Sequence, residues 1–137
     1  MNDTIFGKIV REEFPCYKIY EDEKSLAFLD IYPIQTGEVI IVPKAPVEYV
    51  WELNDLDYIA LMRSAKIVAQ QLLKEFPGSL IGMQIEGLEI KYAHIKLFPF
   101  KTEKDFRAKP KRDHAPNDEA LEKMRLRLHI GNSYARV

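Results

Sequence analysis

The sequence predicts an α+β fold, an antiparallel sheet of about five strands with one long helix and a C-terminal helix. Three observations support this prediction. Strand-like segments lie on both sides of one long amphipathic segment, residues 55–76. Most of these strands are joined by short turns, which favours antiparallel pairing. A second amphipathic segment, residues 116–130, follows near the C-terminus.

The length of the chain suits a single domain. Its 137 residues fall within the size of one typical domain. We expect a core over residues 4–100, and a basic loop and a C-terminal helix over residues 101–137. Hydrophobic residues make up 47% of the sequence and charged residues 30%, which is ordinary for a soluble globular protein. The net charge of −1 gives no basic field, so no nucleic-acid partner is expected.

Cysteine content and hydropathy further limit the class of protein to which the chain can belong. Cys16 is the only cysteine, which excludes an intramolecular disulfide and a cysteine-based zinc site. No segment approaches the roughly 20 apolar residues that cross a bilayer. The first residues lack the basic and apolar regions of a signal peptide. We therefore expect a cytoplasmic enzyme or binding domain with no membrane partner.

The first part of the chain is predicted to contain a short helix and three strands. Apolar residues at helical spacing behind a capping residue predict a helix over residues 4–11. Residues 17–20 and 25–30 are predicted to pair as antiparallel strands around a polar turn. The β-branched run over residues 38–42 is typical of a central strand, which Pro43 ends.

The longest predicted helix covers residues 55–76. Asn54 is its expected N-cap, and the Pro77-Gly78 pair is a stop signal. Apolar residues at i, i+4 and i+7 spacing predict a core-facing stripe. The stripe consists of Leu61, Ala65, Val68, Leu72 and Phe76.

The last predicted strands cover residues 80–85 and 92–98, joined by a tight turn, and Pro99 is expected to end the second. Residues 101–112 are rich in lysine and arginine. They are interpreted as an exposed loop. The alternative is that this segment helps to hold a phosphate or an acidic partner. In the helix over residues 116–130, one apolar stripe comprises Leu121, Met124 and Leu128.

The strand over residues 92–98 carries the most distinctive chemistry. Period-two alternation places Tyr92, His94 and Lys96 on one face, with neighbouring side chains roughly 6.5–7 Å apart. An imidazole between a phenol and an ammonium is suited to receiving a phosphate. The same pattern is also typical of the solvated face of an antiparallel sheet. The residues alone leave both interpretations open.

Five blocks give this strand a context, and together they resemble the histidine-triad family of nucleotide hydrolases and transferases over most of the first hundred residues. In that family the signature strand is His-φ-His-φ-His-φ-φ, with φ apolar. The corresponding positions here hold Tyr92, His94 and Lys96. The blocks are Ile5-Phe6-Gly7-Lys8-Ile9-Val10, Tyr17-Lys18-Ile19-Tyr20-Glu21-Asp22, Leu26-Ala27-Phe28-Leu29-Asp30-Ile31-Tyr32-Pro33, residues 37–44 and Leu97-Phe98-Pro99.

The resemblance implies an activity at the α-phosphate of a purine nucleotide, as a phosphohydrolase or nucleotidyltransferase acting on a P–N, P–S or P–O–P bond. His94, at the middle position, is implied to be the nucleophile, forming a nucleotidyl-histidine intermediate that water cleaves. Lys96 is expected to donate to a phosphate oxygen as a point charge. Tyr92 is expected to offer a hydroxyl hydrogen bond.

The resemblance also implies a nucleoside pocket. Phe28 and Ile31 would sandwich the base, and Asp30 would accept hydrogen bonds from the ribose hydroxyls. Gly87 corresponds to the glycine of a Gly-Gln pair whose glutamine contacts the phosphate region, and Leu88 takes the place of that glutamine. Taken alone, Phe28 and Ile31 would equally suit core packing, and Asp30 would suit a turn cap.

Two further functions remain open. Because Leu88 donates no hydrogen bond, one alternative is a catalytically impaired module that binds a nucleotide as a sensor or partner. The other is a structural homodimer without a ligand. The resemblance itself implies a homodimer formed through the long helix and a sheet edge. No cofactor or metal is expected, because Thr4 and Gly7 stand where some relatives carry a zinc-binding Cys-x-x-Cys.

Overall fold

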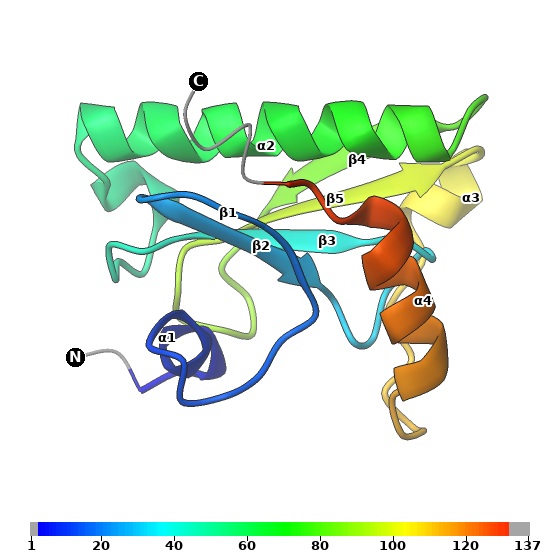
Figure 1. Cartoon of the computed structure of the whole chain (residues 1–137), viewed down its shortest axis with the longest axis horizontal. Coiled ribbons are helices and arrows are strands. Elements are labelled where there is room, and N and C mark those ends of the chain that lie inside the picture. The colour runs from blue at the N-terminus through cyan, green and yellow to red at the C-terminus, as the bar shows by residue number, and fades with distance from the viewer. Residues whose placement is uncertain (1–2, 132–137) are drawn as a thin grey trace.

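The computed structural model describes residues 3–131 and confirms the predicted α+β fold. Its strands form one antiparallel sheet in the order β1-β2-β3-β5-β4. Helices cover both faces of this sheet (Figure 1). The strands are β1 Lys18–Glu21, β2 Ser25–Leu29, β3 Val39–Pro43, β4 Leu80–Ile85 and β5 Ile95–Phe100.

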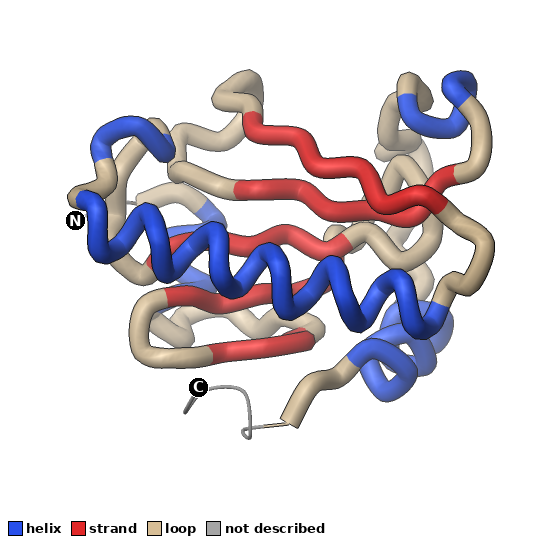
Figure 2. The backbone as a smooth tube through the Cα atoms, turned by 90° about the horizontal axis from the view of Figure 1, so that it is seen from above, coloured by secondary structure: helices blue, strands red, loops and turns tan. Residues whose placement is uncertain are grey.

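The long helix α2, Asp55–Glu75, lies across one face of the sheet (Figures 1 and 2). A short 3₁₀ helix η1, Val50–Glu52, precedes it, and the Asn54 side chain caps it by accepting from the N–H of Asp57. Phe76, directly after the helix, is partly buried. The rest of the predicted stripe is fully buried, which confirms that this face packs on the core: Leu61, Ala65, Val68 and Leu72.

The short helix α1, Ile5–Val10, covers part of the opposite face. The Thr4 hydroxyl caps it by accepting from the N–H of Gly7 at 3.1 Å. Phe6 and Ile9 face the sheet and form a second buried cluster with Leu26, Phe28, Ile40, Val42 and Tyr92. Because α1 is short, it leaves the remainder of this sheet face available for a cavity.

The C-terminal helix α4, Asp118–Leu128, closes one end of the sheet. Leu121 and Leu128 are buried, and Met124 packs against the same cluster, which confirms the predicted stripe. After the helix, the N–H of Ile130 donates to the carbonyl of Ile19 in β1 at 2.9 Å. The chain end is thereby tied back to the first strand.

Two predictions about the region around β5 were wrong. The strand begins at Ile95 rather than at residue 92, because the preceding residues bond elsewhere: the N–H of Ala93 donates to the carbonyl of Val47 at 2.8 Å. The strand also continues through Pro99, which has a partner in β4 but lies beyond the last pairing with β3. Such one-sided positions are where strands tolerate proline.

The predicted loop over residues 101–112 contains a further helix, α3, Glu103–Phe106. The Thr102 side chain caps it. Phe106 anchors it to β5, with ring centroids 5.4 Å from Phe98 and 5.0 Å from Phe100. The other elements begin and end within two residues of their predicted bounds. Of the helices among the residues described, none combines the length and apolarity of a membrane span.

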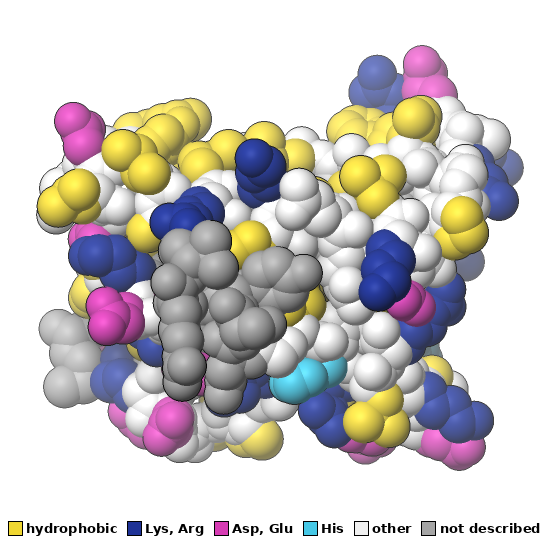
Figure 3. Space-filling view, turned by 45° about the horizontal axis from the view of Figure 1, so that its top comes forward, with side chains coloured by type: hydrophobic (Ala, Val, Ile, Leu, Met, Phe, Trp, Pro, Cys, Tyr) yellow, Lys and Arg dark blue, Asp and Glu magenta, His cyan; other side chains and the backbone are white. Residues whose placement is uncertain are grey.

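The β4 side of the molecule exposes apolar side chains. Strand β4 is at the sheet edge, and Leu80 and Met83 are 60% and 47% exposed on it. Leu56, Ile59 and Leu73 of α2 are also exposed. Hydrophobic side chains gather along the top of Figure 3, where α2 and β4 lie.

The α4 packing predicts a sharp contrast between two leucines of one helix. Replacing the fully buried Leu128 with alanine should lower the free energy of unfolding by about 2–5 kcal/mol, because it leaves a cavity in the core. Leu126→Ala, at a 65% exposed position, should change it by about 0.5 kcal/mol or less. Urea unfolding measures both, and equal effects would contradict the placement of α4 in the core.

Candidate functional site

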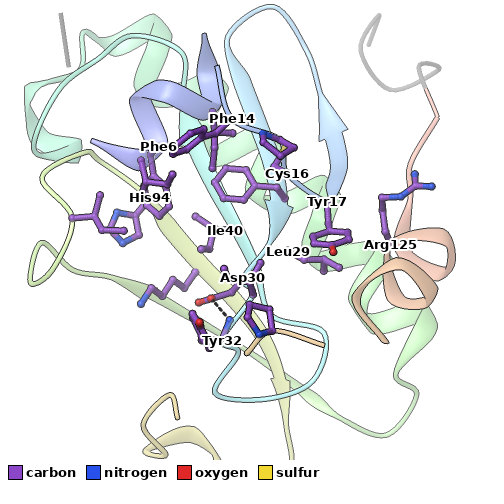
Figure 4. Close-up of a pocket in the computed structure, with 18 of the residues that line it drawn as sticks. Phe6, Phe14, Cys16, Tyr17, Leu29, Asp30, Tyr32, Ile40, His94 and Arg125 are labelled. Carbon is purple, nitrogen blue, oxygen red and sulfur yellow. Dashed lines mark hydrogen bonds between the residues drawn. The ribbon is translucent and has the colours of Figure 1, made fainter. Parts of the chain in front are cut away.

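A cavity of about 760 Å³ lies on the face of the sheet that α1 only partly covers. Its walls come from α1, the end of β2, the segment leading into β5, and α4. Figure 4 shows His94 and Phe6 close together in this cavity, with Asp30 and Tyr32 further along it. The volume falls within the range of about 300–1,000 Å³ that is common for small-ligand pockets.

His94 is held in one tautomer at the wall of the cavity. Its Nδ1–H donates to the carbonyl of Tyr92 at 2.7 Å, because a carbonyl oxygen can only accept. The neutral ring therefore carries its lone pair on Nε2. The edge of the Phe6 ring packs against the imidazole with a centroid distance of 5.0 Å, and His94 is 3% exposed.

The surroundings of His94 favour the neutral imidazole. Burial lowers its pKa, and the charge of Lys96 lowers it further, while the hydrogen bond to Tyr92 and the carboxylates of Glu86 and Asp30 act in the opposite direction. The net shift is downward. A neutral, oriented imidazole with a lone pair on Nε2 is suited to nucleophilic attack.

Lys96 lies on β5 and also lines the cavity. Its side chain is 15% exposed, and its ammonium donates to Glu86 at 3.2 Å. At the rim, the guanidinium of Arg112 pairs with Glu89 at 2.8 Å. Two cations therefore line the cavity, each paired with a carboxylate.

Asp30 directly follows β2. Its Oδ1 accepts from the N–H of Tyr32 at 2.9 Å, and its own N–H donates to the carbonyl of Glu38 at 3.1 Å. These bonds fix the start of the connection to β3 and direct the carboxylate to the cavity, which Asp30 lines. Asp30 therefore caps the turn, a role that the sequence left open, and also faces the cavity.

Phe28 and Ile31 both line the cavity, on either side of Asp30 in sequence. Phe28 is buried and its ring lies 5.5 Å from that of Phe6 in an edge-on arrangement. Ile31 is 42% exposed. Phe28 therefore combines the core packing and the cavity lining that the sequence presented as alternatives, whereas Ile31 lines the cavity as an exposed side chain.

Tyr92 and Gly87 are not brought to the cavity. Tyr92 is 1% exposed and packs against Phe6, but its hydroxyl donates to the carbonyl of Pro43 at 2.7 Å. Burial raises its pKa to about 12. Gly87 lies against the ring of Tyr49, and the neighbouring Leu88 is 82% exposed. The phenol is therefore engaged away from the cavity, and of the turn it is Glu86 and Glu89, not Gly87 or Leu88, that line it.

Sequence reasoning missed several residues of the cavity. Phe6 and Ile9 were expected only as apolar positions of a helix, and nothing local relates α4 to His94. The link is tertiary: the hydroxyl of Tyr17 donates to Asp118 of α4 at 2.6 Å. The missed lining residues include Ile5, Phe6, Ile9, Phe14, Cys16, Tyr17, Tyr32, Ile40, Glu86, Ile90, Asp118, Glu122 and Arg125.

A second cavity of about 550 Å³ adjoins the first, since both are lined by Asp30, Tyr32 and Lys96. It adds Arg107 and Lys109, which belong to the basic segment after β5. It also adds Glu38, which the sequence suggested only as part of a strand.

Together these features define a class. An antiparallel α+β sheet carries a cavity lined by a buried histidine, a lysine and an aspartate that directly follows a strand. Residues 11–109, most of the chain, match the family model described as the HIT domain. The chain therefore belongs to the histidine-triad (HIT) family, which confirms the resemblance found in the sequence. Membership supports a nucleotide-binding or hydrolase-type function in general.

Individual relatives agree with this assignment. An uncharacterized HIT-like protein of Synechococcus elongatus is 44% identical over 101 residues, which cover 69% of this chain and 88% of that protein. Adenylylsulfatase HINT3 of Arabidopsis thaliana is 29% identical over 105 residues, or 73% of this chain and 53% of that protein.

Solved structures show the same fold. A HIT-like protein from Bartonella henselae has a TM-score of 0.78 and 21% identity, covering 93% of this chain and 95% of that one. A hypothetical histidine triad nucleotide-binding protein from Sulfolobus tokodaii has a TM-score of 0.73 and 25% identity, covering 90% and 87%.

The environment of His94 predicts a low titration point. Because burial penalises the imidazolium, His94 should titrate below the ordinary imidazole pKa of 6.5. An NMR titration of the imidazole resonances measures this, and His94→Ala assigns the signal by its disappearance. A midpoint at or above 6.5 would contradict the buried, neutral imidazole.

Proposed function

We propose that this protein is a nucleotide phosphohydrolase or nucleotidyltransferase that acts at the α-phosphate of a purine nucleotide derivative. The observation that carries the proposal is His94. It is a buried neutral imidazole whose Nδ1–H is engaged by Tyr92, so that Nε2 is the free nucleophile in a cavity of nucleotide size.

In the proposed binding mode, the base lies between Phe28 and Ile31, and the ribose hydroxyls donate to Asp30. These residues and His94 line one continuous cavity. The α-phosphate is then held between the nucleoside end of the cavity and the imidazole. Lys96 lies on the same wall and supplies positive charge for the phosphoryl oxygens.

The proposed reaction has two steps. Nε2 of His94 attacks phosphorus, a P–N bond forms, and the leaving group departs with the electron pair of the broken bond. Water then attacks the nucleotidyl-histidine, releases a nucleoside monophosphate and restores the imidazole, with its surplus proton passing to solvent. An acceptor hydroxyl in place of water gives the transferase reaction. The names of two similar proteins, an adenylylsulfatase and a nucleotide-binding protein, support nucleotide chemistry of this kind.

A specific observation favours the alternative, a nucleotide-binding module with little or no turnover. The Tyr92 hydroxyl is committed to Pro43, and Leu88 is an exposed apolar side chain. Neither residue supplies a hydrogen bond to a phosphoryl group. Removing one positioned donor typically costs about 10²–10³ in rate, so a site with few donors binds its ligand better than it transforms it.

Release of AMP from an adenosine phosphoramidate tests the catalytic proposal. The wild type should turn over, and His94→Ala should lose about a thousandfold or more in kcat because the nucleophile is gone. His129→Ala, at an exposed position after α4, is the matched control and should keep full activity.

The other outcomes separate the alternatives. If the wild type shows no turnover above buffer but AMP raises its Tm, the binding module is the correct function. If AMP neither turns over nor binds, the nucleotide proposal fails, and only the fold and family remain.

We also propose that two copies pair through α2 and the β4 edge. This surface combines an unpaired strand edge with the exposed side chains of Leu80 and Met83, and exposed edges of this kind favour pairing. The neighbouring helix adds exposed apolar area at Leu56, Ile59 and Leu73.

Introducing a negative charge into this surface is expected to change the mass of the protein in solution. Met83→Asp should convert a dimer to a monomer in analytical ultracentrifugation, because a carboxylate would be buried in the interface. Leu126→Asp, at an apolar position on α4 that is 65% exposed, should leave the dimer intact. A monomeric wild type, or a Met83→Asp variant that remains dimeric, would contradict the proposed pairing.

A further inference from the structure

Glu38 is a buried carboxyl group for which the proposed reaction has no use. It directly precedes β3 and is 1% exposed. Buried carboxyl groups are rare unless they are paired, because removing a charge from water is costly. Its position is also central, since it lines the second cavity next to Asp30 and Lys96.

The bonds of Glu38 close the connection between β2 and β3. Its Oε1 accepts from the N–H of Ile34 at 2.9 Å, and its carbonyl accepts from the N–H of Asp30 at 3.1 Å. Its own N–H donates to the carbonyl of Gln35 at 3.1 Å. The backbone bond and the register of β2 and β3 place Asp30 opposite Glu38, the side chains of both residues line the second cavity, and a side-chain hydrogen bond with Asp30 is among the causes that raise the pKa of Glu38.

Two carboxyl groups in hydrogen-bond contact must share a proton, because two carboxylates have no hydrogen to place between them. Burial, together with the hydrogen bond and charge of Asp30, raises the pKa of Glu38 to about 9, while the Ile34 N–H and Lys96 oppose the shift. The proton therefore resides on Glu38 at neutral pH. Asp30 also lines the first cavity, at the proposed position of the nucleoside.

Other charged groups line the same cavities as this pair. Lys96, from β5, is the cation whose charge acts on Glu38. The second cavity also presents Glu86, Glu89, Arg107, Lys109 and Arg112. A third cavity of about 450 Å³, which Asp30 and Glu38 also line, presents Lys111 and His114. Among the described residues, Asp30 is the acidic group whose hydrogen bond and charge raise the pKa of Glu38.

We propose that Glu38 is a positioning residue that, in its protonated form, donates to Asp30 and so holds the carboxylate in place for the ribose hydroxyls. This inference rests on the proposed nucleotide function. With Tyr32 and Glu38 as its two donors, the Asp30 carboxylate is fixed in orientation before a ligand enters. Ionisation of Glu38 replaces this bond with repulsion between two carboxylates and releases the wall that Ile31 and Tyr32 form.

If Glu38 were purely structural, its replacement would change stability alone. As a positioning residue, it also governs how strongly the site prefers a ribose over a sugar that lacks hydroxyls. The readout is therefore the affinity ratio between AMP and 2′,3′-dideoxy-AMP. The phosphate and base are the same in both probes, so the ratio reports the contact with Asp30.

Calorimetry at pH 7 and pH 10 tests the proposal on the full chain. Glu38→Gln keeps an N–H donor for Asp30 and an acceptor for Ile34 but cannot ionise. The wild type should prefer AMP about tenfold at pH 7, as expected for one lost hydrogen-bonding group, and should lose this preference at pH 10. Glu38→Gln should keep it at both pH values, and Glu38→Ala should lack it at both.

The Gln variant also controls for other groups that titrate in alkali. Cys16 lines the nucleoside cavity and burial raises the pKa of its thiol, but it is present in both proteins. A preference that persists in the wild type at pH 10, or that disappears equally in Glu38→Gln, would overturn the positioning role. Failure of AMP to bind the wild type at pH 7 would overturn the proposed function and this inference with it.

A stability measurement reports the protonation without any nucleotide. The raised pKa means that the folded protein holds a proton that the unfolded chain releases, so the contribution of Glu38 is full below its ordinary pKa of 4.5 and is lost as the pH rises to about 9. The Tm of the wild type should therefore fall relative to that of Glu38→Gln between pH 5 and pH 9. Parallel Tm curves would contradict a protonated Glu38.

Discussion

The hydrogen bond from His94 Nδ1–H to the carbonyl of Tyr92 is the interaction on which the proposed site depends. It fixes the tautomer of the imidazole and leaves the lone pair on Nε2, the proposed nucleophile. The segment before β5 is held against the end of β3 and the residues that follow it, through the Tyr92 hydroxyl on Pro43 and the Ala93 N–H on Val47. Tyr92, which the alternation placed on one face with His94 and Lys96, therefore anchors the segment that carries His94.

The two faces of the sheet have different tasks. Helix α2 spans one face and buries a long apolar stripe, so most of the core lies there. On the other face, α1 supplies Phe6, whose ring contacts both Phe28 and His94, but the helix is too short to cover the strand ends. The cavity occupies the uncovered part, and its chemistry comes from the loops that meet there.

Periodicity predicted the fold because α2 and the strands each bury one regular set of residues, such as Leu61 and Leu72. The resemblance predicted His94, Lys96, Phe28, Asp30 and Ile31, which do line one cavity. Patterns failed where long-range bonds decide the geometry. Alternation alone could not show that the Tyr92 hydroxyl reaches Pro43, or that Glu38 meets Asp30 across the loop between β2 and β3.

The central claim is that His94 forms a covalent bond to the nucleotide. Mixing the wild type with an adenosine phosphoramidate, quenching within milliseconds in denaturant at alkaline pH, and measuring intact mass tests it most directly, since phosphohistidine-type bonds are labile in acid. The account predicts an added mass of one adenylyl group on the peptide that contains His94. Release of AMP without any such adduct, and equal release by His94→Ala, would contradict the account.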